Sequence, residues 1–91
     1  LHWQQVLRNV QAGYVTSIEL DELYAKEADG NLQALEVLAW IYAKGIGVEP
    51  DLIRSFSFYK KAAELDVSGA AENAVKVYRA MSAAQKAELA Q

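Results

Sequence analysis

The chain has 91 residues, no cysteine and a formal net charge of −3 at pH 7. This length fits one small domain. The missing cysteines exclude disulfides, thiolate metal sites and cysteine nucleophiles, and the acidic balance disfavours broad nucleic-acid binding. No apolar stretch approaches the ~18 residues of a membrane-spanning helix, so membrane insertion is not expected. Abundant alanine and leucine, a single proline and no sustained apolar/polar alternation predict an all-α fold.

The first two expected helices cover residues 1–12 and 17–28. Gly13 ends the first helix, and the spacing of Thr16 and Glu19 fits a capping box at the start of the second. Apolar residues at helical spacing predict the buried face of each helix. These residues are Trp3, Val6, Leu7 and Val10 in the first helix, and Leu20, Leu23, Tyr24 and Ala28 in the second.

A helical hairpin follows, and its turn is the most informative stretch. Asn31 is expected to cap a third helix that ends at Lys44. Gly45 suits a left-handed helix end, Pro50 cannot continue a helix interior, and Asp51 can cap a fourth helix from Leu52 to about Leu65. The expected buried residues are Ala34, Leu35, Leu38, Ile41 and Tyr42 in the third helix, and Leu52, Phe56, Tyr59 and Ala63 in the fourth.

Two further helices complete the chain. Ser68 is expected to cap a fifth helix that ends near Ala80, and Ser82 a short sixth helix over residues 83–90. The expected buried face of the fifth helix consists of Ala71, Ala74, Val75 and Tyr78.

The sequence also contains an internal repeat. A shift of 35 residues pairs Thr16 with Asp51, Ile18 with Ile53, Leu23 with Phe58, Tyr24 with Tyr59 and Ala28 with Ala63. A shift of 36 residues pairs Ala34 with Ala70, Leu38 with Ala74, Ile41 with Val77 and Tyr42 with Tyr78. Because caps, small residues and aromatics recur in the same order, we interpret the chain as an array of helix hairpins.

The repeat resembles the Sel1-like repeat family, a relative of tetratricopeptide repeats. The matching residues are Gly30, Ala34, Leu38, Tyr42, Gly45, Gly47, Val48, Asp51, Tyr59, Ala62 and Ala63. The departures are mild: Ala39 replaces a usual glycine, Phe58 a common tryptophan, Ser55 an alanine and Asp66 the closing glycine. The resemblance implies antiparallel helix-hairpin repeats stacked as an α-solenoid, a right-handed superhelix of about six helices.

On this interpretation residues 1–91 form a single repeat domain with three parts. Residues 1–29 are a partial or degenerate repeat, residues 30–66 a complete repeat, and residues 67–91 a truncated repeat plus a capping helix. Since the chain starts at Leu1 and residues 81–90 resemble a closing helix, we expect a fragment from the C-terminal end of a longer array.

The resemblance implies a non-catalytic scaffold that binds a protein or peptide, without cofactor or metal, of the kind found in the bacterial cytoplasm or periplasm. The first helix of each pair would line the concave face. The candidate binding residues are Gln33, Glu36, Val37, Trp40, Lys44, Asn73 and Lys76. Trp40 is either a binding anchor or a packing residue between hairpins. Two alternatives stay open: a structural C-terminal cap of a longer array, and an accessory domain tethered to an enzyme in the parent chain.

Other chemistry has weak support in the sequence. Gly45 and Gly47 match neither phosphate-loop pattern, His2 has no partners at metal-ligand or catalytic spacing, and four carboxylates on the second helix look like a solvated face. We therefore expect no enzyme activity. Dimerisation through the Trp3 face at the N-terminal end is expected, because a fragment cut from an array exposes apolar surface there.

Overall fold

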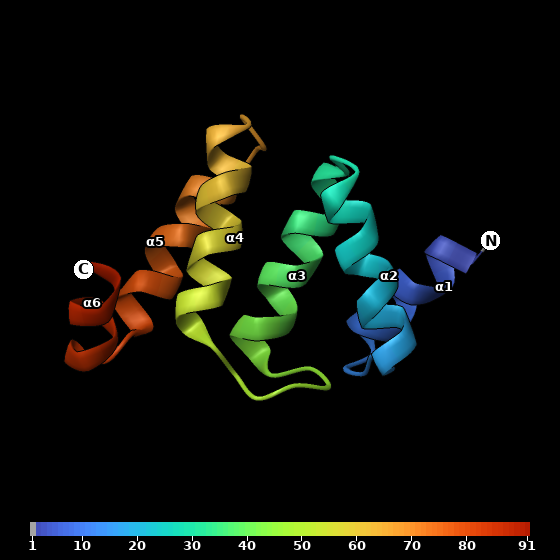
Figure 1. Ribbon diagram of the computed structural model, residues 1–91, viewed down its shortest axis with the longest axis horizontal. Helices are drawn as coiled ribbons and strands as arrows, with labels where there is room; N and C mark the ends of the chain where they lie inside the picture. Colours follow the sequence, from blue (N-terminus) through green and yellow to red (C-terminus); the bar gives the residue numbers. More distant parts are fainter. Residues whose placement is uncertain (1) are drawn as a thin grey trace.

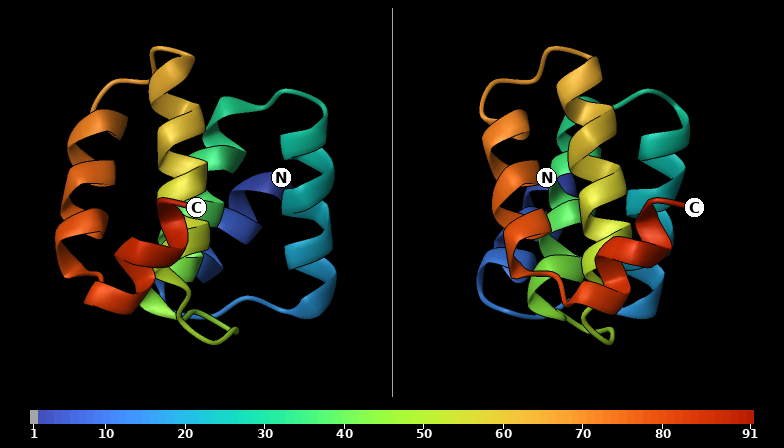
Figure 2. Two further views of the ribbon diagram at one scale, coloured as in Figure 1. Left: turned by 60° about the vertical axis from the view of Figure 1, so that its left-hand side comes forward. Right: turned by 90° about the vertical axis from the view of Figure 1, so that its left-hand side faces the viewer.

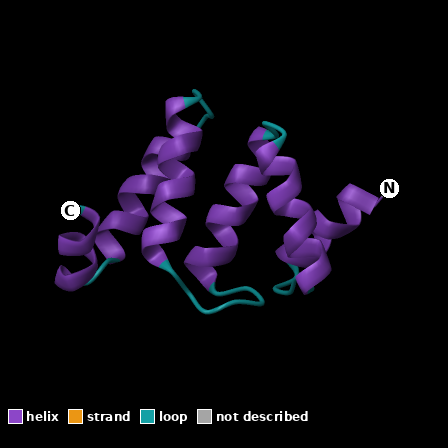
Figure 3. Ribbon diagram, in the orientation of Figure 1, coloured by secondary structure: helices purple, strands orange, loops and turns teal. Residues whose placement is uncertain are grey.

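The computed structural model describes residues 2–91, and that part of the chain forms six α-helices and no strand (Figures 1 and 3). The expected helical start at Leu1 lies outside the described residues. The helices are α1 (His2–Gln11), α2 (Ser17–Ala28), α3 (Leu32–Lys44), α4 (Leu52–Glu64), α5 (Ala70–Ala80) and α6 (Ala83–Leu89). The all-α prediction is therefore confirmed, and each helix agrees with its expected range to within a residue or two.

Side-chain caps set the starts of four helices. The Thr16 hydroxyl accepts from the Glu19 backbone, and Glu19 accepts in return from the Thr16 N–H, which completes the predicted capping box of α2. Asn31 and Asp51 accept from backbone N–H groups in the first turns of α3 and α4. Ser82 caps α6. These caps satisfy donors that a helix N-terminus would otherwise leave unpaired.

The start of α5 differs from the prediction. Ser68 does not cap it; Gly69 occupies that position with φ of 80° and makes no side-chain cap bond. A cap at Ser68 would require Gly69 to be the first helical residue, which a left-handed backbone prevents. Asp66 is also left-handed, with φ of 62°. Sel1-like repeats, which the sequence resembles, have glycine at this position. Aspartate tolerates the left-handed conformation better than most residues.

The turn between α3 and α4 is built as expected. Gly45 ends α3 with φ of 73°, and its N–H donates to the Ile41 carbonyl. A Cβ on Gly45 would lie 2.6 Å from the Pro50 ring, and one on Gly47 would lie 2.8 Å from the Val15 carbonyl oxygen. Both glycines are needed because the turn folds back on itself and also packs against the loop before α2.

Successive helices from α2 to α5 run antiparallel and lie side by side, with α4 in contact with both α3 and α5 (Figures 1 and 2). α1 crosses behind this row and contacts α3. The radius of gyration is 12.9 Å, close to the ~12 Å expected for a compact domain of this length. This packing is compatible with an array of helix hairpins.

Three clusters of buried residues form the core, and Phe58 packs against all of them. The first joins α1, α2 and α3 and contains Val6, Val10, Leu23, Leu38, Ile41, Tyr42 and Ile46. The second contains Ala39, Tyr59, Ala74, Val77 and Met81, and the third Leu35, Ala62 and Ala70. Between α3 and α4, the fully buried Ser55 hydroxyl donates to the Ala39 carbonyl at 2.7 Å.

Burial follows the internal repeat on one face and departs from it on another. Ala34, Leu38 and Ile41 are buried on α3, and so are their repeat partners Ala70, Ala74 and Val77 on α5. The expected burial of α3 is confirmed throughout. The expected burial of Ala71, Val75 and Tyr78 is wrong: all three are exposed, because within residues 2–91 no following helix packs along α5 as α4 packs along α3. Ala28, at the end of α2, is likewise exposed.

Candidate binding cleft

A cleft of about 440 Å³ lies between α1, α3 and α5. Its size falls within the roughly 300–1,000 Å³ typical of ligand pockets. It is lined by Leu7, Val10 and Gln11 of α1, Gln33, Glu36, Val37 and Trp40 of α3, Tyr59 of α4 and Asn73 of α5. We call this set of residues the cleft.

α3 supplies more of the cleft lining than any other helix, because one face of this helix packs into the core and another faces the cleft. Ala34, Leu38 and Ile41 point into the core and are fully buried. Gln33, Glu36, Val37 and Trp40 stand at positions i, i+3, i+4 and i+7, which places them together on another face of the helix. Trp40 is 45% exposed and belongs to none of the three core clusters.

Glu36 and Tyr59 are the two ionisable residues in the cleft lining. Tyr59 reaches the cleft from α4 and is only 6% exposed. Its pKa is raised, first by burial and then by the negative charge of the Glu36 carboxylate. Glu36 is the single formally charged residue among those that line the cleft, so the cleft carries a local negative charge.

Three amide side chains supply the remaining polar surface: Gln11, Gln33 and Asn73. The Gln33 carbonyl oxygen accepts from the Trp3 indole N–H at 3.1 Å, which fixes the direction of that amide. An amide offers both donor and acceptor groups. The cleft can therefore hydrogen-bond a ligand that presents both kinds of group.

Five of the seven residues predicted for a binding face line the cleft together: Gln33, Glu36, Val37, Trp40 and Asn73. Lys44 and Lys76 are exposed and lie outside the lining. The Lys44 ammonium lies 5.1 Å from the centre of the Trp40 ring, within cation–π range.

Sequence reasoning missed the contribution of α1 and of Tyr59. Leu7 and Val10 were expected on the buried face of α1, yet they also border the cleft. The shifts of 35 and 36 residues did not extend to α1, and only the assignment of residues 1–29 to a partial repeat placed α1 beside α3. Tyr59 was assigned to packing, which it also serves in the second core cluster.

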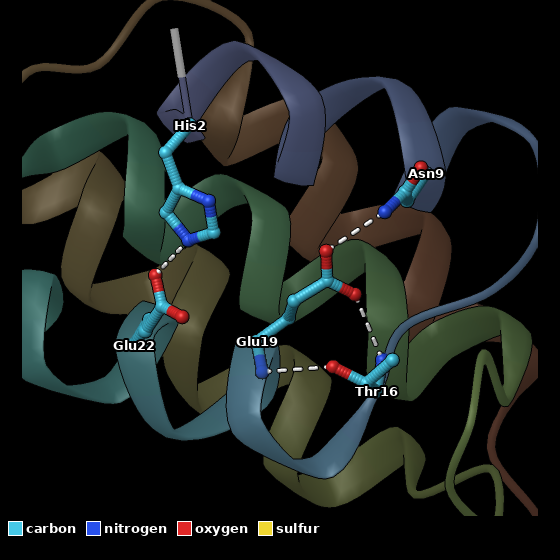
Figure 4. Close-up of polar contacts among 5 residues, drawn as sticks. All are labelled: His2, Asn9, Thr16, Glu19 and Glu22. Atoms are coloured by element: carbon cyan, nitrogen blue, oxygen red, sulfur yellow. Dashed lines mark hydrogen bonds and ion pairs between the residues drawn. The ribbon is translucent and has the colours of Figure 1, made fainter.

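Polar contacts of α1 with α2 lie outside the cleft (Figure 4). Glu19 accepts from the Thr16 backbone and from the Asn9 amide, and these bonds lower its pKa, the Thr16 bond most strongly, although burial opposes them. His2 pairs with Glu22 on the surface. Within residues 2–91, no group of three or more histidine, aspartate or glutamate side chains is placed to hold a metal ion.

Trp3 was expected to form an exposed dimerisation face, but its ring is partly covered. It packs against the first core cluster, and the Lys26 ammonium lies 5.0 Å from its ring centre. The packing role predicted for the repeated tyrosines is confirmed for Tyr24, Tyr42 and Tyr59, whereas Tyr78 is 40% exposed.

The Tyr24 and Tyr42 hydroxyls lie 2.7 Å apart, and Arg54 donates to Tyr42. Burial, together with the hydrogen bond to Tyr42, raises the pKa of Tyr24 to about 12. The Tyr24 hydroxyl is therefore protonated at neutral pH, and the three hydrogen-bonded side chains join α2, α3 and α4.

Comparisons with models of protein families, with curated protein sequences and with solved structures found no match. Among residues 2–91, none of the helices has the length and apolar character required to cross a membrane.

Proposed function

We propose that this chain is a non-catalytic binding module that holds a peptide segment of a partner protein in the cleft. We also propose that its helix hairpins are Sel1-like repeats stacked as a right-handed α-solenoid. The paired burial of α3 and α5 and the paired caps Thr16 and Asp51 support the repeat.

The single observation that carries the proposed function is the exposure of Trp40 within a cleft lined by residues of four helices. Trp40 is 45% exposed although neighbouring positions on the same helix are fully buried. Tryptophan is enriched among the residues that dominate binding energy. A helix that needed Trp40 only for packing would bury it.

The lining suits an extended peptide. Each residue of a peptide main chain carries a donor and an acceptor, and Gln11, Gln33 and Asn73 can pair with both. Val37 and Trp40 offer apolar contact to side chains. Glu36 is the only charged residue in the lining, and it favours a peptide with a lysine or arginine at the matching position.

A direct test uses the fluorescence of Trp40. Trp3→Phe leaves Trp40 as the sole tryptophan, since the chain has two. Peptides of about eight residues are selected by display on the folded domain and titrated into this variant. We expect saturable changes in Trp40 emission with micromolar dissociation constants, and enrichment of peptides with a basic residue.

Variants of the cleft complete the test. Trp40→Ala is expected to weaken binding, measured by calorimetry, by at least about tenfold, and Glu36→Gln to weaken basic peptides more than neutral ones. Val75→Lys, outside the cleft, is the matched control. If Trp40→Ala binds the selected peptides as tightly as the original, the proposed function is wrong.

The structural alternative, a closing segment of a longer array, is favoured by α6. This helix has seven residues and its own capping box, and it packs against α4. On that alternative the cleft residues contribute nothing to the free energy of binding a partner. Display would then return no peptide whose binding depends on Trp40.

A further inference from the structure

A second apolar surface lies on the side of α5 that was expected to be buried. Ala71, Ala74, Val75 and Tyr78 of α5 and Phe56 and Ala63 of α4 line a groove of about 460 Å³. Lys60, Arg79 and Lys86 complete its lining. We call this set of residues the α4–α5 groove. It shares no lining residue with the cleft.

The same face of the preceding hairpin is covered by a helix. The repeat pairs Leu35, Ala39 and Tyr42 of α3 with Ala71, Val75 and Tyr78 of α5. On α3 these three residues are 2%, 0% and 6% exposed. On α5, Val75 is 47% and Tyr78 40% exposed. This difference in exposure shows that a helix covers this face of α3, whereas the equivalent face of α5 is open.

α4 shows which side chains fill such a position. Phe58 stacks on Tyr42, with 6.2 Å between ring centres, and meets Tyr24 edge-on. Ser55 donates to the Ala39 carbonyl, and Ala62 shares a core cluster with Leu35. The covering helix thus presents a small residue, an aromatic three positions later and a second small residue four positions after that.

α6 covers only one end of the α4–α5 groove. It crosses the lower ends of α4 and α5 and leaves their upper parts open (Figure 2). Its seven residues span ~10 Å, whereas the 13 residues of α4 span ~20 Å. The Lys86 ammonium lies 5.1 Å from the Tyr78 ring centre and marks that end of the groove.

The charged residues of the groove are all basic. Lys60, Arg79 and Lys86 line it, and no acidic residue does. Within residues 2–91 none of these three cations forms an ion pair. An apolar floor with unpaired cations along its length complements an apolar stripe flanked by carboxylates.

We propose that the α4–α5 groove binds an amphipathic helix of a partner protein, about three turns long, with acidic residues flanking its apolar stripe. The stripe would follow the pattern of α4, with small residues on either side of an aromatic that packs beside Val75, in the part of the groove that α6 leaves open. This binding is independent of peptide binding in the cleft.

The test uses a synthetic probe, a side-chain-stapled helix of about 14 residues, labelled with fluorescein. It carries the Ser-x-x-Phe-x-x-x-Ala spacing of Ser55, Phe58 and Ala62, with glutamates on both flanks. We expect saturable anisotropy changes with a micromolar dissociation constant. A second probe with lysines in place of the glutamates should bind at least about tenfold more weakly.

Two protein variants locate the site. Val75→Glu should weaken binding of the glutamate probe at least about tenfold. The variant should still fold because Val75 is already half-exposed, and circular dichroism checks that it does. Lys60→Glu provides the same test at a second exposed residue. The Trp40→Ala variant, which changes the cleft and not the α4–α5 groove, should bind the glutamate probe with the same dissociation constant as the original protein.

The proposal is overturned if no saturable binding occurs, or if binding persists unchanged in both Val75→Glu and Lys60→Glu. It is also overturned if sedimentation shows that the protein alone is a dimer that Val75→Glu dissociates, because a second copy would then occupy the groove.

Discussion

At the scale of single residues, Glu19 is a buried carboxylate held by hydrogen bonds from two elements. It is 8% exposed and accepts hydrogen bonds from the Asn9 amide at 2.7 Å and from the Thr16 N–H at 3.0 Å. Both bonds favour the ionised carboxylate, and its pKa lies below the ordinary value of 4.5. Glu19 thereby connects the start of α2 to α1.

Replacing Glu19 by glutamine should lower the free energy of unfolding by about 1–2 kcal/mol at pH 7, because two charge-assisted bonds become neutral or are lost. Since the folded-state pKa is lowered, the carboxylate stabilises the fold above the unfolded-state pKa. This contribution disappears as the pH falls through the folded-state pKa. Urea unfolding at pH 7 and about pH 3 should show a smaller difference between variant and original in acid.

Glu22→Gln is the matched control, since within residues 2–91 Glu22 pairs only with the exposed His2. Its expected cost is within about 0.5 kcal/mol. Equal losses for the two variants at pH 7 would contradict the role assigned to Glu19.

At the scale of elements, the turn between α3 and α4 fixes the geometry of the hairpin. Gly45 combines a left-handed backbone with close packing against Pro50. Gly30, between α2 and α3, has φ of 88° but open space around its Cα. Comparing substitutions at these two glycines therefore separates the cost of the backbone conformation from the cost of the steric contact.

Gly30→Ala should cost about 1 kcal/mol, which is the price of the backbone conformation alone. Gly45→Ala should cost roughly 2–4 kcal/mol, because the new methyl group would also meet the rigid proline ring at 2.6 Å. Urea unfolding of both variants measures the difference. If they are equally destabilised, the Pro50 contact does not constrain the turn.

At the scale of the whole molecule, Phe58 connects the three core clusters. Its ring packs against Tyr24 and Tyr42, so α2, α3 and α4 share one aromatic contact. A small domain has a stability of only about 5–15 kcal/mol. Loss of this contact should therefore affect the entire fold rather than one helix.

Phe58→Ala should lower the free energy of unfolding by about 3–4 kcal/mol, and Phe56→Ala by only about 1–2 kcal/mol, since Phe56 packs against one cluster. Circular dichroism and tryptophan fluorescence should report a single transition in both variants. Separate transitions in Phe58→Ala would show that the hairpins fold independently.

The cleft was predictable where it depends on α3 and on the repeat. The helical period placed Gln33, Glu36, Val37 and Trp40 on one face, and the shift of 36 residues led to Asn73 on α5. Leu7, Gln11 and Tyr59 were not predicted, because they reach the cleft through packing between helices that are distant in the sequence.

The sequence by itself determined the helices, most of their caps and the turn at Gly45, because helical period, capping side chains and glycine conformations act within a few residues of one another. Only the tertiary structure decided which apolar faces are covered. Tyr42 and Tyr78 occupy equivalent repeat positions, yet one is 6% and the other 40% exposed. The physical reason is that burial requires a helix that packs along the same face: α4 packs along α3 and covers Tyr42, whereas α6 packs mainly against α4 and leaves Tyr78 partly exposed.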